Sequence, residues 1–412
     1  MASLLLSQEA SDLCLGKPPL KSVSISATVG EALSALRRLG ESSLSVWSCD
    51  HSSEKSNVSV VGSSDSTEDC RCVGKVCMGD VICFLGKEEN LSSPAKALEA
   101  PLEVLIPKGS GLVRHLEPHA SLVEAIDLVL EGAQNLVIPI QSRWTTATRK
   151  KLLPNRSFNT LHNNREYCWL TQEDIIRHLL NYIGLFSPTS NTPINSLHAI
   201  DTVNILAVHY DDPASASLPL ISQSLAQQTS VAILDVDGRV IGEISQYTLN
   251  TCQESVAAAI ATLSAGDLMA YIDCGGPPDE LVQLVKERLE EKKYGAFLEL
   301  MEEESTMSMS SSSSICSTSS DEEFGWGRRS GGGYSARLVR RWEAIVCYPW
   351  SSLVAVMVQA LSHRVSYVWV VEEDATLSGI VTFASMFKVF RERLRSMGIT
   401  EDEVTQFSLA SL

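Results

Sequence analysis

The segment from Cys168 to Leu180 reads Cys-Trp-Leu-Thr-Gln-Glu-Asp-Ile-Ile-Arg-His-Leu-Leu, and its pattern recurs along the chain. Its first three residues fit the end of a buried strand, and its later apolar residues recur at helical spacing. Thr171 stands at the corner between strand and helix, and Asp174 follows three residues later. A helix N-terminus offers unpaired N–H groups and the positive end of the helix dipole. This corner is therefore suited to hold a phosphate or a ribose.

Three further segments show the same corner, at residues 74–82, 242–249 and 379–386. Each follows an apolar strand, and that strand follows a segment with the apolar spacing of a helix. The helical spacing is weakest before the third corner, where only Leu218, Ile221 and Leu225 maintain it. Self-similarity of this kind predicts four copies of one unit, ordered strand, helix, strand, strand, helix.

This unit resembles the CBS domain, a small module that occurs in pairs in nucleotide-sensing proteins. The resemblance rests on the four corners and on two openings, Ser11-Asp12-Leu13 and Asp267-Leu268-Met269. Within that family the chain resembles the plant CBSX group, and its architecture is similar to the gamma subunits of AMP-activated protein kinase. The resemblance implies an α/β fold of four CBS repeats, arranged as two tandem CBS pairs (Bateman modules).

The four predicted repeats differ mainly in their insertions. Repeat one is expected at residues 11–87 with a mobile Ser-rich insertion at about 48–68, and repeat two at 98–183 with an insertion at about 141–166. Repeat three is expected at residues 194–264 and repeat four at 265–397. The insertion of repeat four, at about 273–341, holds a Ser- and Gly-rich segment, residues 305–333, that we expect to be disordered.

Composition restricts the location and the partners. A net charge of −17 argues against nucleic acid and anionic membranes as partners, because both require a basic surface. The apolar runs are far shorter than the roughly 20 residues of a membrane-spanning helix. Residues 1–6 lack a basic region, so we expect no signal or transit peptide and an intracellular protein, cytoplasmic or nuclear.

The eleven cysteines are scattered, many of them in apolar strands, as expected of buried thiols in a reducing compartment. Cys70-Arg71-Cys72 forms a close pair, but no second pair or His cluster has zinc-finger spacing. The sequence therefore predicts no metal site.

The resemblance implies roles for the corner residues. In CBS relatives that bind adenine nucleotides, the corner hydroxyl contacts phosphate and the Asp three residues later bonds the ribose. Thr171 and Asp174 match both roles in repeat two. Repeat one keeps Asp80 but has Cys77 at the hydroxyl position, and repeat four has Thr382 followed by Ser385. Repeat three has Ser245 but Thr248 in place of the acid.

His363-Arg364 resembles the His-Arg step that faces nucleotide phosphate in the kinase gamma subunits. Both kinds of site have a purely structural alternative. A cationic pair also suits the C-terminal end of a helix. The Thr-x-x-Asp spacing also fits a capping box, which needs no ligand and stabilises a helix by about 0.5–2 kcal/mol.

The resemblance implies a non-catalytic regulatory protein that senses an adenosine-containing nucleotide, such as AMP, ADP or ATP, and modulates a protein partner. No cofactor is expected, and no catalytic signature is present. Two alternatives are a ligand-free scaffold, or gamma-like subunit of a kinase complex, and a redox regulator that binds a thioredoxin-like protein. The sequence does not decide between a monomer and a homodimer.

Overall fold

Four small sheets form the framework of the computed structural model, which describes residues 8–49, 70–107, 111–140, 161–273, 277–302 and 343–396. Each sheet has three strands that are consecutive in the sequence. The first strand pairs in parallel with the second, and the second pairs antiparallel with the third. The predicted four-fold repeat is confirmed. The predicted disordered segment 305–333 and most of the predicted insertion 48–68 lie outside the described residues.

The repeats share one order of elements. Repeat one contains β1 (Ser22–Ser24), α2 (Val29–Leu39), β2 (Leu44–Trp47), β3 (Cys72–Val76) and α3 (Met78–Leu85). Repeat two contains β4 (Val113–His115), α6 (Leu122–Leu130), β5 (Asn135–Ile140), β6 (Glu166–Thr171) and α7 (Gln172–Asn181). Repeat three contains β7 (Ala207–His209), α8 (Leu218–Gln227), β8 (Ser230–Leu234), β9 (Val240–Ser245), α9 (Gln246–Leu249) and α10 (Val256–Thr262). Repeat four contains β10 (Val346–Cys347), α14 (Leu353–His363), β11 (Tyr367–Val371), β12 (Leu377–Thr382) and α15 (Phe383–Ser396).

Local sequence explains where the helices begin and end. Helix α2 begins after Thr28, whose hydroxyl accepts from the Glu31 N–H while the Glu31 carboxylate accepts from the Thr28 N–H. This reciprocal pair is a capping box. The helix ends at Gly40, whose left-handed backbone (φ 61°) suits a residue without a side chain.

The segment that opens each repeat packs on the other repeat of its pair. The short turn η1 (Asp12–Cys14) contacts β6 and α7 of repeat two, and α5 (Pro94–Leu98) contacts α2 of repeat one. In the same way, η6 (Thr189–Asn191) contacts α14 of repeat four, and α11 (Ala265–Tyr271) contacts β7 and β9 of repeat three. The two repeats of a pair therefore exchange their opening segments.

Buried polar contacts also join the sheets within a pair. Glu243 of β9 is fully buried and accepts from the Tyr367 hydroxyl at 2.9 Å and from the Trp369 indole N–H at 2.8 Å, both on β11. In the first pair, Trp47 of β2 lies against Tyr167 of β6, with ring centroids 5.0 Å apart. A buried carboxylate is tolerated here because two donors satisfy it.

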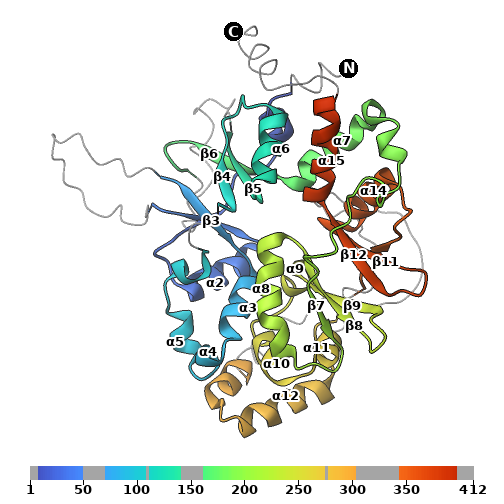
Figure 1. Ribbon diagram of the computed structural model, residues 1–412. Coiled ribbons are helices and arrows are strands. Elements are labelled where there is room, and N and C mark those ends of the chain that lie inside the picture. Colours follow the sequence, from blue (N-terminus) through green and yellow to red (C-terminus); the bar gives the residue numbers. More distant parts are fainter. Residues whose placement is uncertain are drawn as a thin grey trace, which may run out of the picture.

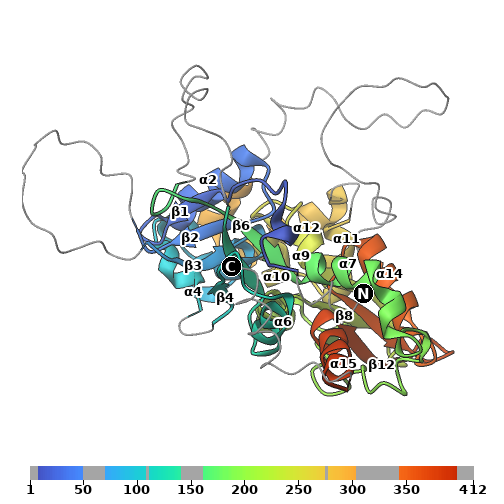
Figure 2. The same cartoon turned by 90° about the horizontal axis from the view of Figure 1, so that it is seen from above.

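The two pairs meet through their helices, so that the repeats occupy four quadrants (Figure 1). Helix α3 packs on α8 and α10, which joins repeats one and three around one core. Helix α15 packs on α6 and α7, and α14 packs on α7, which joins repeats two and four around another. Figure 2 shows β1, β2 and β3 on the side opposite α14 and α15, as expected of diagonal quadrants. Helix α12 (Asp279–Glu291), from the predicted insertion of repeat four, packs on α10 and α11.

One ion pair stabilises the contact between α15 and α6. The buried Arg391 donates from Nε to Asp127 Oδ1 at 2.7 Å and from an Nη atom to Oδ2 at 2.9 Å. Asp127→Ala removes this two-point acceptor from a guanidinium that is only 3% exposed. We expect a loss of about 3 kcal/mol in the free energy of unfolding, measured by urea denaturation.

A matched control is Glu173→Ala, which removes an exposed pair with Arg177 one helical turn away on α7. The control should cost at most about 0.5 kcal/mol. Equal losses for the two variants would contradict a structural role for the buried pair.

Candidate nucleotide-binding clefts

The four corners identified in the sequence all begin helices. Thr171 caps α7, and its hydroxyl accepts from the Asp174 N–H at 3.3 Å. The Asp174 carboxylate accepts in return from the Thr171 N–H at 2.8 Å and from the Thr171 hydroxyl at 2.5 Å. The capping alternative therefore describes a geometry that the protein forms by itself.

A lysine side chain from repeat one also lies at the repeat-two corner. Lys17, which precedes β1, donates from Nζ to the same Asp174 oxygen and to the Trp169 carbonyl at 2.7 Å. Asp174 is thus already neutralised by a cation, and its side chain is 19% exposed. A ribose at this corner must displace Lys17 or use the other carboxylate oxygen. Nucleotide binding by Thr171 and Asp174 remains a prediction.

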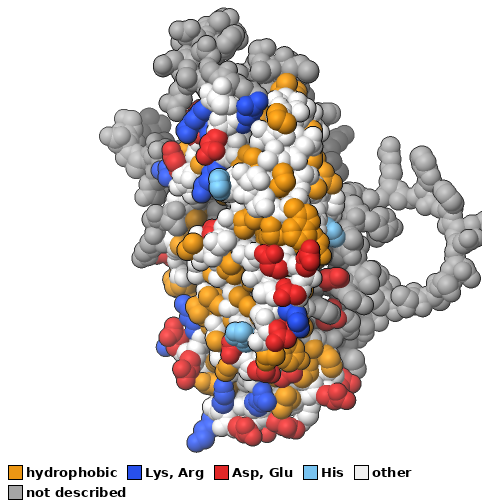
Figure 3. Space-filling view, turned by 45° about the vertical axis from the view of Figure 1, so that its right-hand side comes forward, with side chains coloured by type: hydrophobic (Ala, Val, Ile, Leu, Met, Phe, Trp, Pro, Cys, Tyr) orange, Lys and Arg blue, Asp and Glu red, His pale blue; other side chains and the backbone are white. Residues whose placement is uncertain are grey.

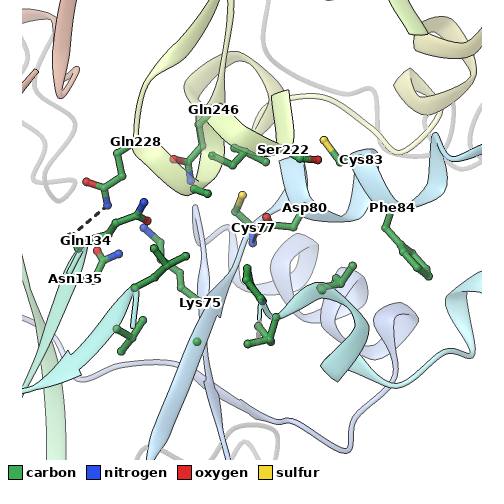
Figure 4. Close-up of a pocket in the computed structure, with 18 of the residues that line it drawn as sticks. Lys75, Cys77, Asp80, Cys83, Phe84, Gln134, Asn135, Ser222, Gln228 and Gln246 are labelled. Carbon is green, nitrogen blue, oxygen red and sulfur yellow. Dashed lines mark hydrogen bonds between the residues drawn. The ribbon is translucent and has the colours of Figure 1, made fainter. Parts of the chain in front are cut away.

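The repeat-one corner opens into a pocket of about 180 Å³ (Figure 4). Its floor comes from the end of β3 and the start of α3, and its walls come from β4, β5 and α8. Val73, Ile106, Leu112 and Val113 supply apolar surface. Repeats one, two and three therefore all contribute to one cavity.

Three charged groups line this pocket: Lys75 and Asp80 lie inside it, and the exposed Lys87 lies at its border. Burial lowers the pKa of Lys75, and the nearby Cys77 and Asp80 partly oppose that shift. Burial raises the pKa of Asp80, whereas hydrogen bonds from Cys77 and the charge of Lys75 oppose it. The Cys77 N–H donates to Asp80 at 2.8 Å, but among the described residues Lys75 forms no hydrogen bond or salt bridge. A desolvated ammonium without a bonded partner is suited to an anion such as phosphate.

Amide side chains surround the pocket on the side of Lys75 in Figure 4. Gln134 and Asn135 come from the start of β5, and Gln228 follows α8 and donates to the Gln134 carbonyl at 3.3 Å. Gln246 comes from the start of α9. Such groups can donate to and accept from the edge of a base. The sequence did not indicate these amides, because all four belong to repeats two and three and reach the repeat-one corner only through packing. It did not indicate Lys75 either.

The remaining predicted residues lie outside this pocket. In repeat four the Thr382 hydroxyl accepts from the Ser385 N–H at 3.1 Å, and the Ser385 hydroxyl accepts from the Thr382 N–H at 3.0 Å. His363 ends α14 and the exposed Arg364 caps it with a left-handed backbone (φ 54°). Thr382 faces Tyr367 across the sheet, so these three residues gather at one end of β11, away from Asp80.

The surface offers no simple guide to the function. On the face in Figure 3, acidic and basic side chains are interspersed, and hydrophobic side chains cover much of the middle. Among the described residues no helix combines the length and the apolar character that a membrane span requires.

Four repeats of this kind, joined through their sheets in two pairs and meeting through helices, define a protein built of two CBS pairs. The fold of the protein MJ1225 from Methanocaldococcus jannaschii, proposed to be an archaeal homologue of g-AMPK, matches with a TM-score of 0.50 and 14% identity. That match covers 93% of this chain and 100% of the archaeal one. No known family profile matches the chain.

Curated relatives identify the family more closely. The CBS domain-containing protein CBSX5 of Arabidopsis thaliana is 44% identical over 409 residues, which span 96% of this chain and 100% of the relative. The chain therefore belongs to the family of CBS domain-containing proteins of the CBSX group, as its repeats indicated. The SNF1-related protein kinase regulatory subunit gamma-like PV42b of the same plant is 22% identical over 327 residues, which span 79% of this chain and 77% of that protein.

The isolated Lys75 leads to a prediction about stability. Its lowered pKa means that the folded protein disfavours the charged form, so charged Lys75 costs stability at neutral pH. Lys75→Met should raise the free energy of unfolding at pH 7 by about 0.5–2 kcal/mol, measured by urea denaturation without ligand. The difference from the parent should shrink as the pH rises toward 10.5, the ordinary pKa of lysine, where the unfolded chain also loses its proton.

Lys87→Met is the matched control, because Lys87 borders the same pocket but is exposed. Its effect should stay within about 0.5 kcal/mol at every pH. Destabilisation by Lys75→Met alone would indicate a structural lysine and contradict this interpretation.

Proposed function

We propose that the protein is a non-catalytic regulatory protein that senses an adenosine-containing nucleotide in the repeat-one pocket and thereby modulates a protein partner. The observation that carries the proposal is that a desolvated Lys75 and the carboxylate of Asp80 line one cavity shared by three repeats. Lys75 suits a phosphate, and Asp80 is an acceptor for ribose hydroxyls. The apolar wall and the amides suit the base.

The site has two features that favour a ligand over a purely structural role. A desolvated lysine without a bonded anion costs stability, and such a cost is common at sites that bind a ligand. Cys77 donates to Asp80, with its N–H bonded to Oδ2, and the carboxylate has further capacity to accept hydrogen bonds.

The position of the pocket provides a route to regulation. Its lining reaches from α3 to β5 and to α8, so it spans the first pair and the contact between the pairs. A ligand that contacts all three repeats favours the packing that brings them together. By linkage, it then changes the affinity for any partner that distinguishes that packing.

A second candidate function is that of a gamma-like regulatory subunit in a kinase complex. It is favoured by the similarity to PV42b, a SNF1-related protein kinase regulatory subunit gamma-like protein, and by the fold shared with MJ1225. In this function the corners need not bind nucleotide, since several already act as complete helix caps. The thioredoxin alternative stays a prediction, and among the described free cysteines only Cys252 is not fully buried.

Calorimetric titration of the full chain with AMP, ADP, ATP and S-adenosylmethionine tests the sensing function. We expect one of these ligands to bind, and Asp80→Ala and Lys75→Met each to weaken binding by about 1.5–3 kcal/mol, or roughly 10- to 150-fold. The same ligand should raise the melting temperature of the parent but not of these variants.

Asp174→Ala is the matched control from the equivalent corner of repeat two, and it should leave the affinity unchanged. If Asp174→Ala alone abolishes binding, the ligand occupies the repeat-two cleft instead. If the parent gives neither heat nor a melting shift with any of the four ligands, sensing is wrong and the gamma-like scaffold becomes the better proposal.

A further inference from the structure

A group of two cysteines and one histidine lies at the other end of β3 from the pocket. Cys49 follows β2, Cys70 precedes β3, and His162 precedes β6 of the neighbouring repeat. The two sulfur atoms and a histidine ring nitrogen lie within 4.8 Å of one another. In the sequence, Cys70 forms a close pair with Cys72, but the fold places Cys70 beside Cys49 and His162 instead.

The three candidate ligand atoms lie close to one another. His162 Nδ1 lies 3.1 Å from the Cys70 sulfur and 3.3 Å from the Cys49 sulfur. In a tetrahedral zinc site, with Zn–S near 2.3 Å and Zn–N near 2.0 Å, the sulfur and nitrogen ligands are about 3.5 Å apart. The Cα atoms of the two cysteines are 5.2 Å apart, and a disulfide joins their sulfur atoms in this structure. The same positions, in the dithiol form, bring three metal ligands into range.

The histidine is held in place as metal-binding histidines usually are. Its Nε2 lies 2.9 Å from the Ser22 hydroxyl, which leaves Nδ1 directed at the two sulfur atoms. The Trp47 indole stacks on the imidazole with ring centroids 3.6 Å apart, and His162 is 3% exposed. Next to it, the Asn163 amide donates to the Cys70 carbonyl at 3.2 Å. These contacts hold the imidazole in one orientation without a bound metal.

We propose that Cys49, Cys70 and His162 bind one Zn²⁺ when both cysteines are reduced. Thiolate and imidazole are the ligands that zinc prefers, and three of them leave one tetrahedral position to a solvent molecule. Binding releases the two thiol protons, and the two thiolates and the neutral imidazole each donate one electron pair to the metal. No electron is transferred in this step.

The site would join the two paired repeats by metal coordination. Cys49 and Cys70 belong to repeat one, and His162 belongs to repeat two. Metal binding should therefore stabilise the sheet contact that also includes Trp47 and Tyr167. Strand β3 runs from this site to Lys75, so the metal would also stabilise the strand that forms the floor of the repeat-one pocket.

The test uses the full chain, stripped of metal with a chelator in the presence of a phosphine reductant. Titration with Co²⁺, which replaces zinc and absorbs visible light, should saturate at one equivalent with a sulfur-to-cobalt charge-transfer band. Added Zn²⁺ should abolish the band. Zinc measured by elemental analysis after gel filtration should also reach one atom per chain.

Three variants make the assignment specific. Cys70→Ser and His162→Ala should each lower the bound zinc to below a tenth of the parent value. Cys72→Ser should retain it, because Cys72 is the neighbouring cysteine whose sulfur instead donates to the Gly74 carbonyl. Circular dichroism in the absence of metal checks that each variant is folded.

The proposal is overturned if the reduced parent binds no stoichiometric zinc, which would leave Cys49 and Cys70 as a disulfide pair only. It is also overturned if Cys72→Ser loses the metal while His162→Ala keeps it. Neither result depends on nucleotide binding, so the two proposals fail independently.

Discussion

No repeat of this protein can bury its own apolar surface, and the rest of the structure follows from that constraint. A three-stranded sheet with two helices leaves a sheet face and a helix face exposed. The sheet face is covered by the other repeat of the pair, through the exchanged opening segments and buried contacts such as Glu243 with Tyr367 and Trp369. The helix face is covered by the other pair, which produces two cores that each contain residues from both pairs. The clefts between repeats are therefore a consequence of how the apolar surfaces are covered.

Within the first pair, the two corners share one backbone geometry but face different surroundings. At the repeat-two corner, Lys17 approaches from the segment before β1 and neutralises Asp174, so the corner is satisfied without a ligand. At the repeat-one corner, Leu112 just before β4 and Val113 at its start contribute apolar side chains. The cation there is Lys75, on β3 itself, and it faces a cavity. The two corners thus differ less in their own residues than in what the neighbouring repeat places opposite them.

Strand β3 connects the two places where the structure points to chemistry. The strand begins two residues after Cys70, which belongs to the cluster with Cys49 and His162. It ends directly before Cys77 at the corner. Both sites lie at the contact between repeats one and two, where β3 neighbours β4. A ligand at either site would act on the same sheet contact, which gives the proposed regulation a physical basis.

The sequence by itself determined the repeated unit, because apolar periodicity and corner residues depend only on neighbours a few positions away. From these residues alone follow the four repeats, the strand-to-helix corners and the resemblance to CBS proteins. The sequence placed the most complete corner at Thr171 and Asp174, where both residue types are present, and predicted no metal site. Only the tertiary structure showed that Lys17 contacts Asp174 and that amides from three other segments line the pocket of Lys75. It also showed that His162 lies beside Cys70 and Cys49, which are 92 and 113 positions away in the sequence. These contacts depend on the packing of one repeat against another, and that packing involves residues far apart in the chain.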